Sequence, residues 1–179
     1  LMLTSVGKAR ALGVPENRWV YPHAGTEAWD HLYVSERDNL HTSPAIRLTS
    51  RKLFELTGYS ADQMDHVDLY SCFPAAVQVS ANEIGLSQDR PLTVTGGLTF
   101  AGGPLNNYVM HSVARMVDLL RAKPGSTGLV TANGGLLTKH ALCIYSTDAP
   151  DQPFAWANLQ DEVDAMPRRE VEIDHDGAV

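Results

Sequence analysis

The sequence predicts an α/β fold in which helices cover both faces of a mixed five-stranded sheet. Three observations carry this prediction: helical and strand-like segments alternate, a glycine-rich loop leads into an apolar helix, and a short glycine turn joins the last two strands. Alternating helices and strands are typical of a mostly parallel sheet, whereas strands joined by a short turn pair in antiparallel fashion. The 179 residues are enough for one domain with a hydrophobic core.

Composition narrows the classes of partner. The chain is 44% hydrophobic and 20% charged, as in a globular protein, and its net charge of −7 comes without a long basic run. Nucleic acid and anionic membrane surfaces are therefore not expected partners. No apolar run approaches the roughly 20 residues of a membrane span. Cys72 and Cys143 are too few for a disulfide scaffold, so we expect a cytoplasmic protein, and the histidines lack metal-ligand spacing.

Several segments have the character of strands. They are residues 19–24, 67–70, 92–95, 127–132 and 141–146. Residues 25–41 are polar and aromatic and predict a long surface loop. Asn133, Gly134 and Gly135 predict the turn between the last two strands.

Local capping signals predict the helices. Residues 2–12 predict a short amphipathic helix. Ser43 and Pro44 are a favourable N-cap and first residue for a helix that ends at Gly58. A capping-box spacing at residues 60–63 predicts a helical turn. Pro74 and Gly85 predict the first residue and the end of a further helix.

The glycine-rich segment 95–105 precedes a helix that we expect to run from Pro104 to about Arg121. This helix is apolar over most of its circumference, which predicts that it is buried. Glycines before a helix N-terminus let a ligand approach the backbone amides. The alternative is that they only form turns.

The composition of the chain changes after residue 147. Pro150, Pro153 and the acidic run 161–164 predict that residues 148–179 are an acidic linker or tail, after a domain at 1–147 and leading to a further domain. Residues 169–173 are a candidate for one more strand. A chain that begins Leu1-Met2 is expected to be a piece of something longer.

Three motifs, in this order, resemble the C-terminal half of the thiolase superfamily. Residues 67–73 are similar to the family motif Asn-Glu-Ala-Phe, or His-Asp-Cys-Phe in the sterol-carrier type. Residues 96–105 are similar to its Gly-Gly-x4-Gly-His-Pro loop, and residues 129–141 fall where the family has a Cys-x-Gly-Gly loop. The resemblance covers residues 1–147 and is strongest to sterol-carrier-type thiolases and thiolase-like acetyl-CoA acetyltransferases of actinobacteria.

The resemblance implies a partner and a substrate class. Such proteins are built from two similar halves, and the first half carries the acyl-accepting cysteine. We therefore expect an N-terminal thiolase half, in the same or another chain, as the partner of this one, and a homo- or hetero-oligomer. The expected substrate is a coenzyme A thioester, with no tightly bound cofactor and no metal. We also expect an exposed apolar face where the first half docks.

The departures from the family pattern concern its catalytic residues. Gly103 stands at the position of the family's histidine, which lowers the pKa of the nucleophile. Ala132 or Asn133 stands at the position of its second cysteine, and Tyr70 begins the Asn-Glu-Ala-Phe motif. These substitutions predict that Claisen-type chemistry is absent, and whether the chain is part of an enzyme stays open.

Binding groups remain in these loops. The predicted substrate-binding residues are Gly102, Gly103, Asn133, Gly134 and Gly135, whose backbone amides resemble an oxyanion hole. Tyr70 and His140 are the predicted catalytic residues, because both can exchange or donate a proton. The alternatives are an aromatic packed under a loop for Tyr70 and a surface histidine for His140. Cys72 and Cys143 match no nucleophile motif.

Several functions follow from these residues. The first is the C-terminal domain of a thiolase-like acyltransferase that handles acyl-CoA thioesters in lipid metabolism. The alternatives are a non-catalytic thiolase-fold module for acyl-CoA binding or partner assembly, and a thiolase-like retro-aldolase. A nucleotide-binding α/β domain is disfavoured, because the glycines lack the dinucleotide fingerprint.

Overall fold

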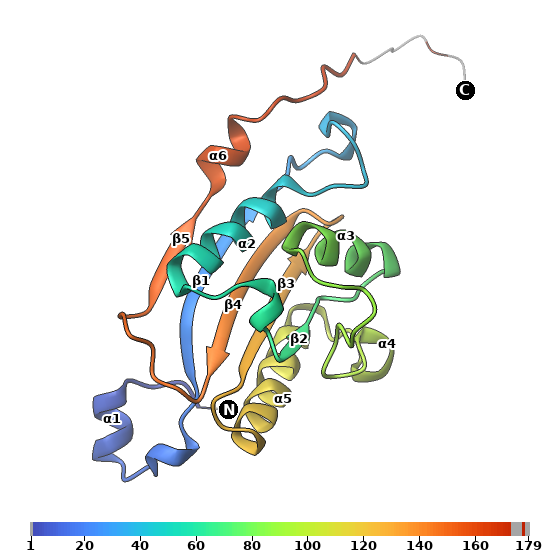
Figure 1. Cartoon of the computed structure of the whole chain (residues 1–179). Coiled ribbons are helices and arrows are strands. Elements are labelled where there is room, and N and C mark those ends of the chain that lie inside the picture. The colour runs from blue at the N-terminus through green and yellow to red at the C-terminus, as the bar shows by residue number, and fades with distance from the viewer. Residues whose placement is uncertain (1, 173–176, 178–179) are drawn as a thin grey trace.

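A single mixed sheet organises the chain, which a computed structural model describes over residues 2–172 and 177. Its strands lie in the order β2-β3-β4-β1-β5 (Figure 1). Four of them run in one direction and β4 runs against them. The C-terminal ends of those four strands and the N-terminal end of β4 therefore lie at the same end of the sheet, here called its carboxyl end. The strands are β1 (Tyr21–Trp29), β2 (His66–Asp68), β3 (Thr127–Gly134), β4 (Lys139–Ser146) and β5 (Ala155–Asn158).

Local capping defines the helices on one face of the sheet. In α2 (Pro44–Thr57) the Ser43 hydroxyl accepts the Ile46 amide, and Gly58 ends the helix with φ 72°. Both were predicted from the sequence, as was the capping box at Ser60, which opens a 3-10 turn, Ala61–Gln63. The helix α3 (Pro74–Ile84) ends at Gly85, as predicted. The first helix, α1 (Val6–Ala11), is shorter than predicted.

Two helical layers cover the sheet unequally. Helices α2 and α3 pack on one face, where Leu53, Ile84, Leu129, Leu142 and Ile144 belong to the main core cluster. On the other face, α5 (Tyr108–Ala122) packs on β3 through Met116, Leu120 and Val130. A Cβ atom on Gly128 would lie 2.2 Å from the Met116 sulfur, so glycine lets the helix approach the strand closely.

The second face is open beyond α5. Trp156 and Trp29 lie on this face of β5 and β1, and they are 54% and 47% exposed. The Trp156 ring lies against Gly25, where an added Cβ would be 2.8 Å away. This face therefore carries two exposed aromatic side chains, but Glu27 and Lys139 share it, and Lys139 lies over the Trp29 ring. The expected docking face stays a prediction.

The fifth strand is not the one that the sequence suggested. Residues 92–95 form no strand, although the Leu69 amide donates to the Leu92 carbonyl at 2.9 Å. Instead, β5 pairs in parallel with β1 from Ala24–Ala155 to Glu27–Asn158. Part of the expected tail thus completes the sheet. The prolines and acidic residues around this short strand hid its pattern.

The segment after β5 is also attached. In the short helix α6 (Gln160–Asp164), Val163 packs with Leu159 against Ala28 and Ala45. Residues 169–172 form no regular strand, and Ile173 of the predicted extra strand lies outside the described residues. Part of the loop predicted at 25–41 is also strand, because β1 continues to Trp29.

The helix α5 begins later than predicted. Pro104 has ψ 64° and precedes a 3-10 turn, Leu105–Asn107, in which Leu105 has φ 50°. These dihedral angles interrupt the helical path, so α5 starts at Tyr108 rather than Pro104. Its sheet side is buried, but Met110 on the other side is 49% exposed in this chain. No helix in the described part of the chain is long and apolar enough to cross a membrane.

Candidate functional site

Three chain segments that the sequence analysis singled out meet at the carboxyl end of the sheet. Tyr70 follows β2, and its backbone amide donates to the Thr131 hydroxyl of β3 at 2.9 Å. Asn133, near the end of β3, donates from Nδ2 to the Cys72 sulfur at 3.4 Å. Asn133 is also the register partner of His140 on β4. The fold therefore brings Tyr70, Asn133 and His140 to the same end of the sheet, and their predicted roles stay predictions.

Tyr70 is half-buried, with its ring edge-on to that of Tyr108. The ring centroids are 5.2 Å apart and the planes are at 85°. Burial, with smaller effects from Cys72 and Tyr108, raises the pKa of the Tyr70 phenol above its ordinary value. Tyr70 is therefore protonated at neutral pH and able to donate a hydrogen bond.

Asn133 has one unused polar atom. Its Oδ1 is buried and has no hydrogen-bond partner among the described residues. Buried acceptors normally have a donor, and this atom is one of three such exceptions in the described chain, with His31 Nδ1 and His66 Nε2. Cys72, beside it, is partly exposed, and we had not placed it among the site residues. Its sequence signal was a match to the cysteine of the His-Asp-Cys-Phe motif, a position that the resemblance implies is non-catalytic.

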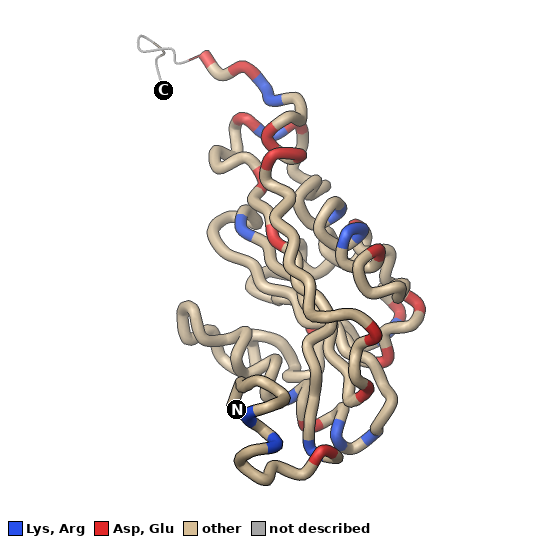
Figure 2. Tube along the Cα trace, turned by 90° about the vertical axis from the view of Figure 1, so that its left-hand side faces the viewer, with Lys and Arg blue, Asp and Glu red and all other residues tan. Residues whose placement is uncertain are grey.

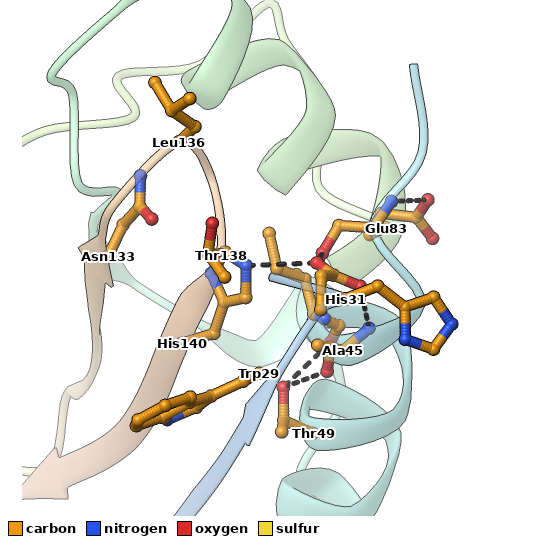
Figure 3. Close-up of polar contacts among 12 residues, drawn as sticks. Trp29, His31, Ala45, Thr49, Glu83, Asn133, Leu136, Thr138 and His140 are labelled. Carbon is orange, nitrogen blue, oxygen red and sulfur yellow. Dashed lines mark hydrogen bonds and ion pairs between the residues drawn. The ribbon is translucent and has the colours of Figure 1, made fainter. Parts of the chain in front are cut away.

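His140 is a buried residue and not the surface histidine considered as an alternative. Its side chain points toward the start of α2 (Figure 3), where Nε2 lies 3.2 Å from Asp30 Oδ2. Asp30 also accepts the Ala45 amide at 3.0 Å and the Ser43 hydroxyl. Burial alone would raise the pKa of Asp30, but the hydrogen bonds from His140, Ser43 and Ala45 lower it overall.

Arg37 fixes the turn between β3 and β4. It donates from Nε to the His31 carbonyl at 2.9 Å, from Nη1 to the Leu136 carbonyl at 2.8 Å and from Nη2 to the Thr138 hydroxyl at 2.7 Å. Leu137 in this turn has φ 52°, an uncommon value for a side chain other than glycine. Neither Arg37 nor Asp30 was predicted from the sequence, because their partners in the β3–β4 turn and β4 are distant in the chain.

The glycine-rich loop touches the end of β2 through its first glycines. A Cβ atom on Gly97 would lie 2.8 Å from the Ser71 hydroxyl, which accepts the Leu98 amide at 3.2 Å. The loop then forms a short helix, α4 (Leu98–Ala101). Gly102 and Gly103 follow it and are exposed. Their predicted role in substrate binding stays a prediction, as does that of Gly134 and Gly135.

The surroundings of the site are apolar rather than charged. Phe73, Phe100, Leu105 and Leu136 are each at least 64% exposed in the loops at this end. Lys and Arg are interspersed with Asp and Glu along the described chain (Figure 2). No group of three or more His, Cys, Asp or Glu among the described residues is arranged to hold a metal ion.

One hollow of about 790 Å³ in the described chain is lined by His23, residues 56–59 and residues 148–153, away from this region. Two further hollows lie beside the site or at the far end of the sheet. One of about 410 Å³ adjoins the Asp30 carboxylate and is lined by His31, Arg37, Arg47 and Met166. Another of about 780 Å³ lies at the opposite end of the sheet, between the N-terminal segment and residues 149–154. Neither is lined by Tyr70 or Asn133.

Comparison with solved structures gives two informative similarities. The chain is 40% identical to a monomeric SCP2-thiolase-like protein type 1 from Mycobacterium smegmatis, with a TM-score of 0.86. The match covers 94% of this chain and 38% of that protein.

The second similarity concerns the fold alone. The peroxisomal 3-ketoacyl-CoA thiolase of Saccharomyces cerevisiae, a five-layered structure built from two core domains of identical topology, matches with 17% identity and a TM-score of 0.59. That match covers 79% of this chain and 37% of the yeast protein. No protein-family model and no curated protein matches the sequence.

Proposed function

The chain is a half-domain of the thiolase superfamily, and on this basis we propose that it supplies the C-terminal half of a site that handles acyl-CoA thioesters. The observation that carries the proposal is the meeting of Tyr70, Cys72 and Asn133 at the carboxyl end of the sheet. In open α/β sheets, ligands bind outside the carboxyl ends of the strands.

The residues suit binding of a thioester carbonyl. The protonated Tyr70 phenol is a hydrogen-bond donor. Backbone amides of Gly102, Gly103, Gly134 and Gly135 would add further donors, in the manner of an oxyanion hole. Asn133 Oδ1, buried and without a partner among the described residues, would accept from a ligand N–H or O–H, of which the pantetheine arm of coenzyme A has several.

Proton transfer has fewer candidates. His140 Nε2 is engaged with Asp30, so Nδ1 is the ring atom left for exchange with a ligand. Gly103 provides no imidazole at the position where the family resemblance places one, and an amide such as Asn133 is a poor acid or base. We therefore propose binding without Claisen-type thiolysis by this chain alone.

The proposed partner is a second half-domain that covers the open face. Support comes from the exposed Trp29 and Trp156 on this face, from Met110 on the outer side of the neighbouring α5, and from the paired core domains of the yeast thiolase. Because the chain spans 38% of the mycobacterial protein, a second half in the same chain is one arrangement, and an oligomer is the other.

A chimera tests the proposed site. The matched part of the mycobacterial protein is replaced by this chain, and CoA and acetyl-CoA are titrated by calorimetry. We expect binding by the chimera, about tenfold weaker in Tyr70→Phe, since loss of one hydrogen bond to a ligand costs about 1.4 kcal/mol. The matched control is Tyr33→Phe, an exposed tyrosine outside the site.

Two outcomes would contradict the proposal. One is a folded chimera that binds neither ligand, and the other is equal affinity in Tyr70→Phe and the parent. In a separate assay, the 179-residue chain alone should show no CoA-dependent cleavage of acetoacetyl-CoA, and measurable cleavage would refute that expectation.

The partner face has its own test. The isolated chain should self-associate through its open face, and Met110→Asp should weaken association about tenfold in sedimentation equilibrium. Val171→Asp is the control, because Val171 is also 49% exposed but lies beyond α6. Equal effects of the two substitutions would exclude this face as the docking surface.

Two other functions compete with the first. A non-catalytic binding or assembly module is favoured by the glycine and amide at the family's catalytic positions, and the chimera would then bind acyl-CoA without any turnover. A retro-aldolase is favoured by the protonated Tyr70 phenol, which could assist cleavage of the Cα–Cβ bond of a β-hydroxyacyl thioester. Release of an aldehyde or ketone from such a thioester, absent in Tyr70→Phe, would distinguish it.

A further inference from the structure

A fully buried carboxylate lies two residues before Tyr70, at the end of β2. The Asp68 side chain is 0% exposed. Its Oδ1 accepts the Tyr108 hydroxyl at 3.0 Å and the Ser112 hydroxyl at 2.7 Å. Its Oδ2 accepts the Thr93 hydroxyl at 3.0 Å and the Val94 amide at 2.9 Å. One carboxylate therefore joins the end of β2, the segment before the glycine-rich loop, and the first two turns of α5.

These donors hold the carboxylate without a positive partner. Within residues 2–172, no Lys, Arg or His forms an ion pair with Asp68. A buried charge is costly unless hydrogen bonds satisfy it, so the donors must all be in place together. The three segments are therefore interdependent: displacement of any one leaves the carboxylate under-satisfied.

The donors of Asp68 contact the proposed site directly. The Tyr108 ring is the one that packs edge-on against Tyr70. The Gly97 amide donates to the Thr93 hydroxyl at 2.9 Å and to the Thr95 hydroxyl at 3.0 Å. The Thr95 hydroxyl is also hydrogen-bonded to the Tyr108 hydroxyl at 2.7 Å. Asp68 thus reaches both Tyr70 and the glycine-rich loop through one intermediate side chain each.

We infer that Asp68 is the positioning residue of this site: through Tyr108 it sets the direction of the Tyr70 phenol, and through Thr93 and Thr95 it holds the glycine-rich loop beside it. Asp68 itself is too deeply buried to touch a ligand. The inference rests on the proposed function, because it assigns Asp68 to the site proposed there. A donor held in place before the ligand arrives binds more strongly than one that must be ordered on binding.

The test uses the 179-residue chain with Asp68→Asn. The amide has nearly the same shape and keeps one acceptor, and the Thr, Ser and Tyr hydroxyls can reverse direction, so the fold is expected to persist by circular dichroism. Amide hydrogen exchange should become at least about tenfold faster in residues 96–103. Exchange in the β3–β4 turn should be unchanged, because that turn is fixed by Arg37.

A matched control separates local loosening from general loss of stability. Ser146 is also fully buried and donates to the Ser126 carbonyl at 2.9 Å, but at the opposite end of the sheet. Ser146→Ala should leave residues 96–103 protected. Unchanged protection of this loop in folded Asp68→Asn would overturn the inference, and so would equal loosening in Ser146→Ala.

A spectroscopic readout follows Tyr70 itself. With fluorotyrosine incorporated, the fluorine NMR signal of Tyr70 is identified by its loss in Tyr70→Phe. Asp68→Asn should shift this signal, Ser146→Ala should not, and adding Tyr108→Phe to Asp68→Asn should cause little further shift. An unmoved Tyr70 signal in Asp68→Asn would contradict the role of Asp68.

A second variant covers failure of the first to fold. Thr93→Val removes one donor from Asp68 and one acceptor from Gly97. Exchange of the Gly97 amide should become about threefold faster. An unchanged exchange rate would contradict the inference. None of these readouts requires a CoA thioester. Failure of acyl-CoA binding with a loosened loop would therefore refute the proposed function alone.

Discussion

Two buried aspartates stand at the carboxyl end of the sheet, one on each face, and they are satisfied by different kinds of donor. Asp68 faces α5 and accepts mainly from hydroxyl groups. Asp30 faces α2 and accepts from the His140 ring, the Ser43 hydroxyl and the Ala45 amide. Hydroxyl groups rotate to suit a neutral or charged partner, whereas a backbone amide can only donate.

The two clusters connect different parts of the molecule, so substitutions in them should have different effects. The Asp30 cluster links β1, β4 and the N-terminus of α2, so its loss should damage the framework. The Asp68 cluster links β2 and α5 to the segment that leads into the glycine-rich loop, so its loss should loosen that loop before the rest of the fold.

The largest effect is expected for Asp30→Ala. The Ala45 amide and the His140 ring would lose their acceptor in a buried place, at about 1–3 kcal/mol for each group. The free energy of unfolding should fall by about 3 kcal/mol in urea denaturation. Asp118→Ala, on the exposed side of α5, is the control and should change it by less than about 0.5 kcal/mol. A decrease of less than about 1 kcal/mol in the free energy of unfolding of Asp30→Ala would show that Asp30 is not needed for the framework.

Removal of single hydroxyl groups compares the contribution of one donor in each cluster to stability. Ser43→Ala deletes both the cap of α2 and a donor to Asp30, and should cost about 1–2 kcal/mol. Tyr108→Phe deletes one of several donors to Asp68 and should cost about 1 kcal/mol or less. The same denaturation assay measures both, and the reverse ranking would contradict the difference expected between the two clusters.

The pH dependence of stability provides a third test. The pKa of Asp30 is lowered in the folded chain, so its ionised form stabilises the fold at neutral pH. This stabilisation is lost as the pH falls from the ordinary aspartate value, about 3.9, through the lower folded value. The stability advantage of the parent over Asp30→Asn at pH 7 should therefore shrink in acid. An advantage that is independent of pH would show that the charge of Asp30 is irrelevant.

The smallest effect on stability is expected at Cys72, which lies at the site between the two clusters. Its contact with Asn133 is a weak hydrogen bond, so Cys72→Ser should change stability by less than about 0.5 kcal/mol. A thiol reagent at pH 7 should nonetheless modify Cys72 and spare Cys143, because burial raises the pKa of the Cys143 thiol to about 11. The Cys72→Ser chain should take up no reagent, and labelling of it would contradict the assignment.

Much of the fold was predictable because its signals are local. Ser43, Pro44 and Gly58 define α2 within a few residues of its ends. The Asn133-Gly134-Gly135 signal identified the β3–β4 hairpin, although Asn133 and Gly134 belong to β3 and the turn itself lies at residues 135–138. The edge strand β5 was missed, because its four residues gain stability only from pairing with β1. The start of α5 was misplaced, because the backbone of Leu105 follows the loop and not the helix preference of its neighbours.

The candidate site was predictable only in part. Tyr70, Asn133 and His140 were found through motifs near strand ends. Asp30 and Arg37 were not, since their partners lie 110 and 99 positions away and no local pattern reports such pairings. Asp68 lay within a recognised motif, but its donors come from two other segments that only the folded chain assembles.

The order of strands has a consequence for how the chain is made. β1 leaves the ribosome before both of its neighbours, β4 and β5, which are encoded more than a hundred residues later. At ordinary translation speeds, more than a hundred residues take on the order of ten seconds to synthesise. Throughout that interval β1 has two unpaired edges, so chaperone binding to the nascent polypeptide should centre on residues 21–29.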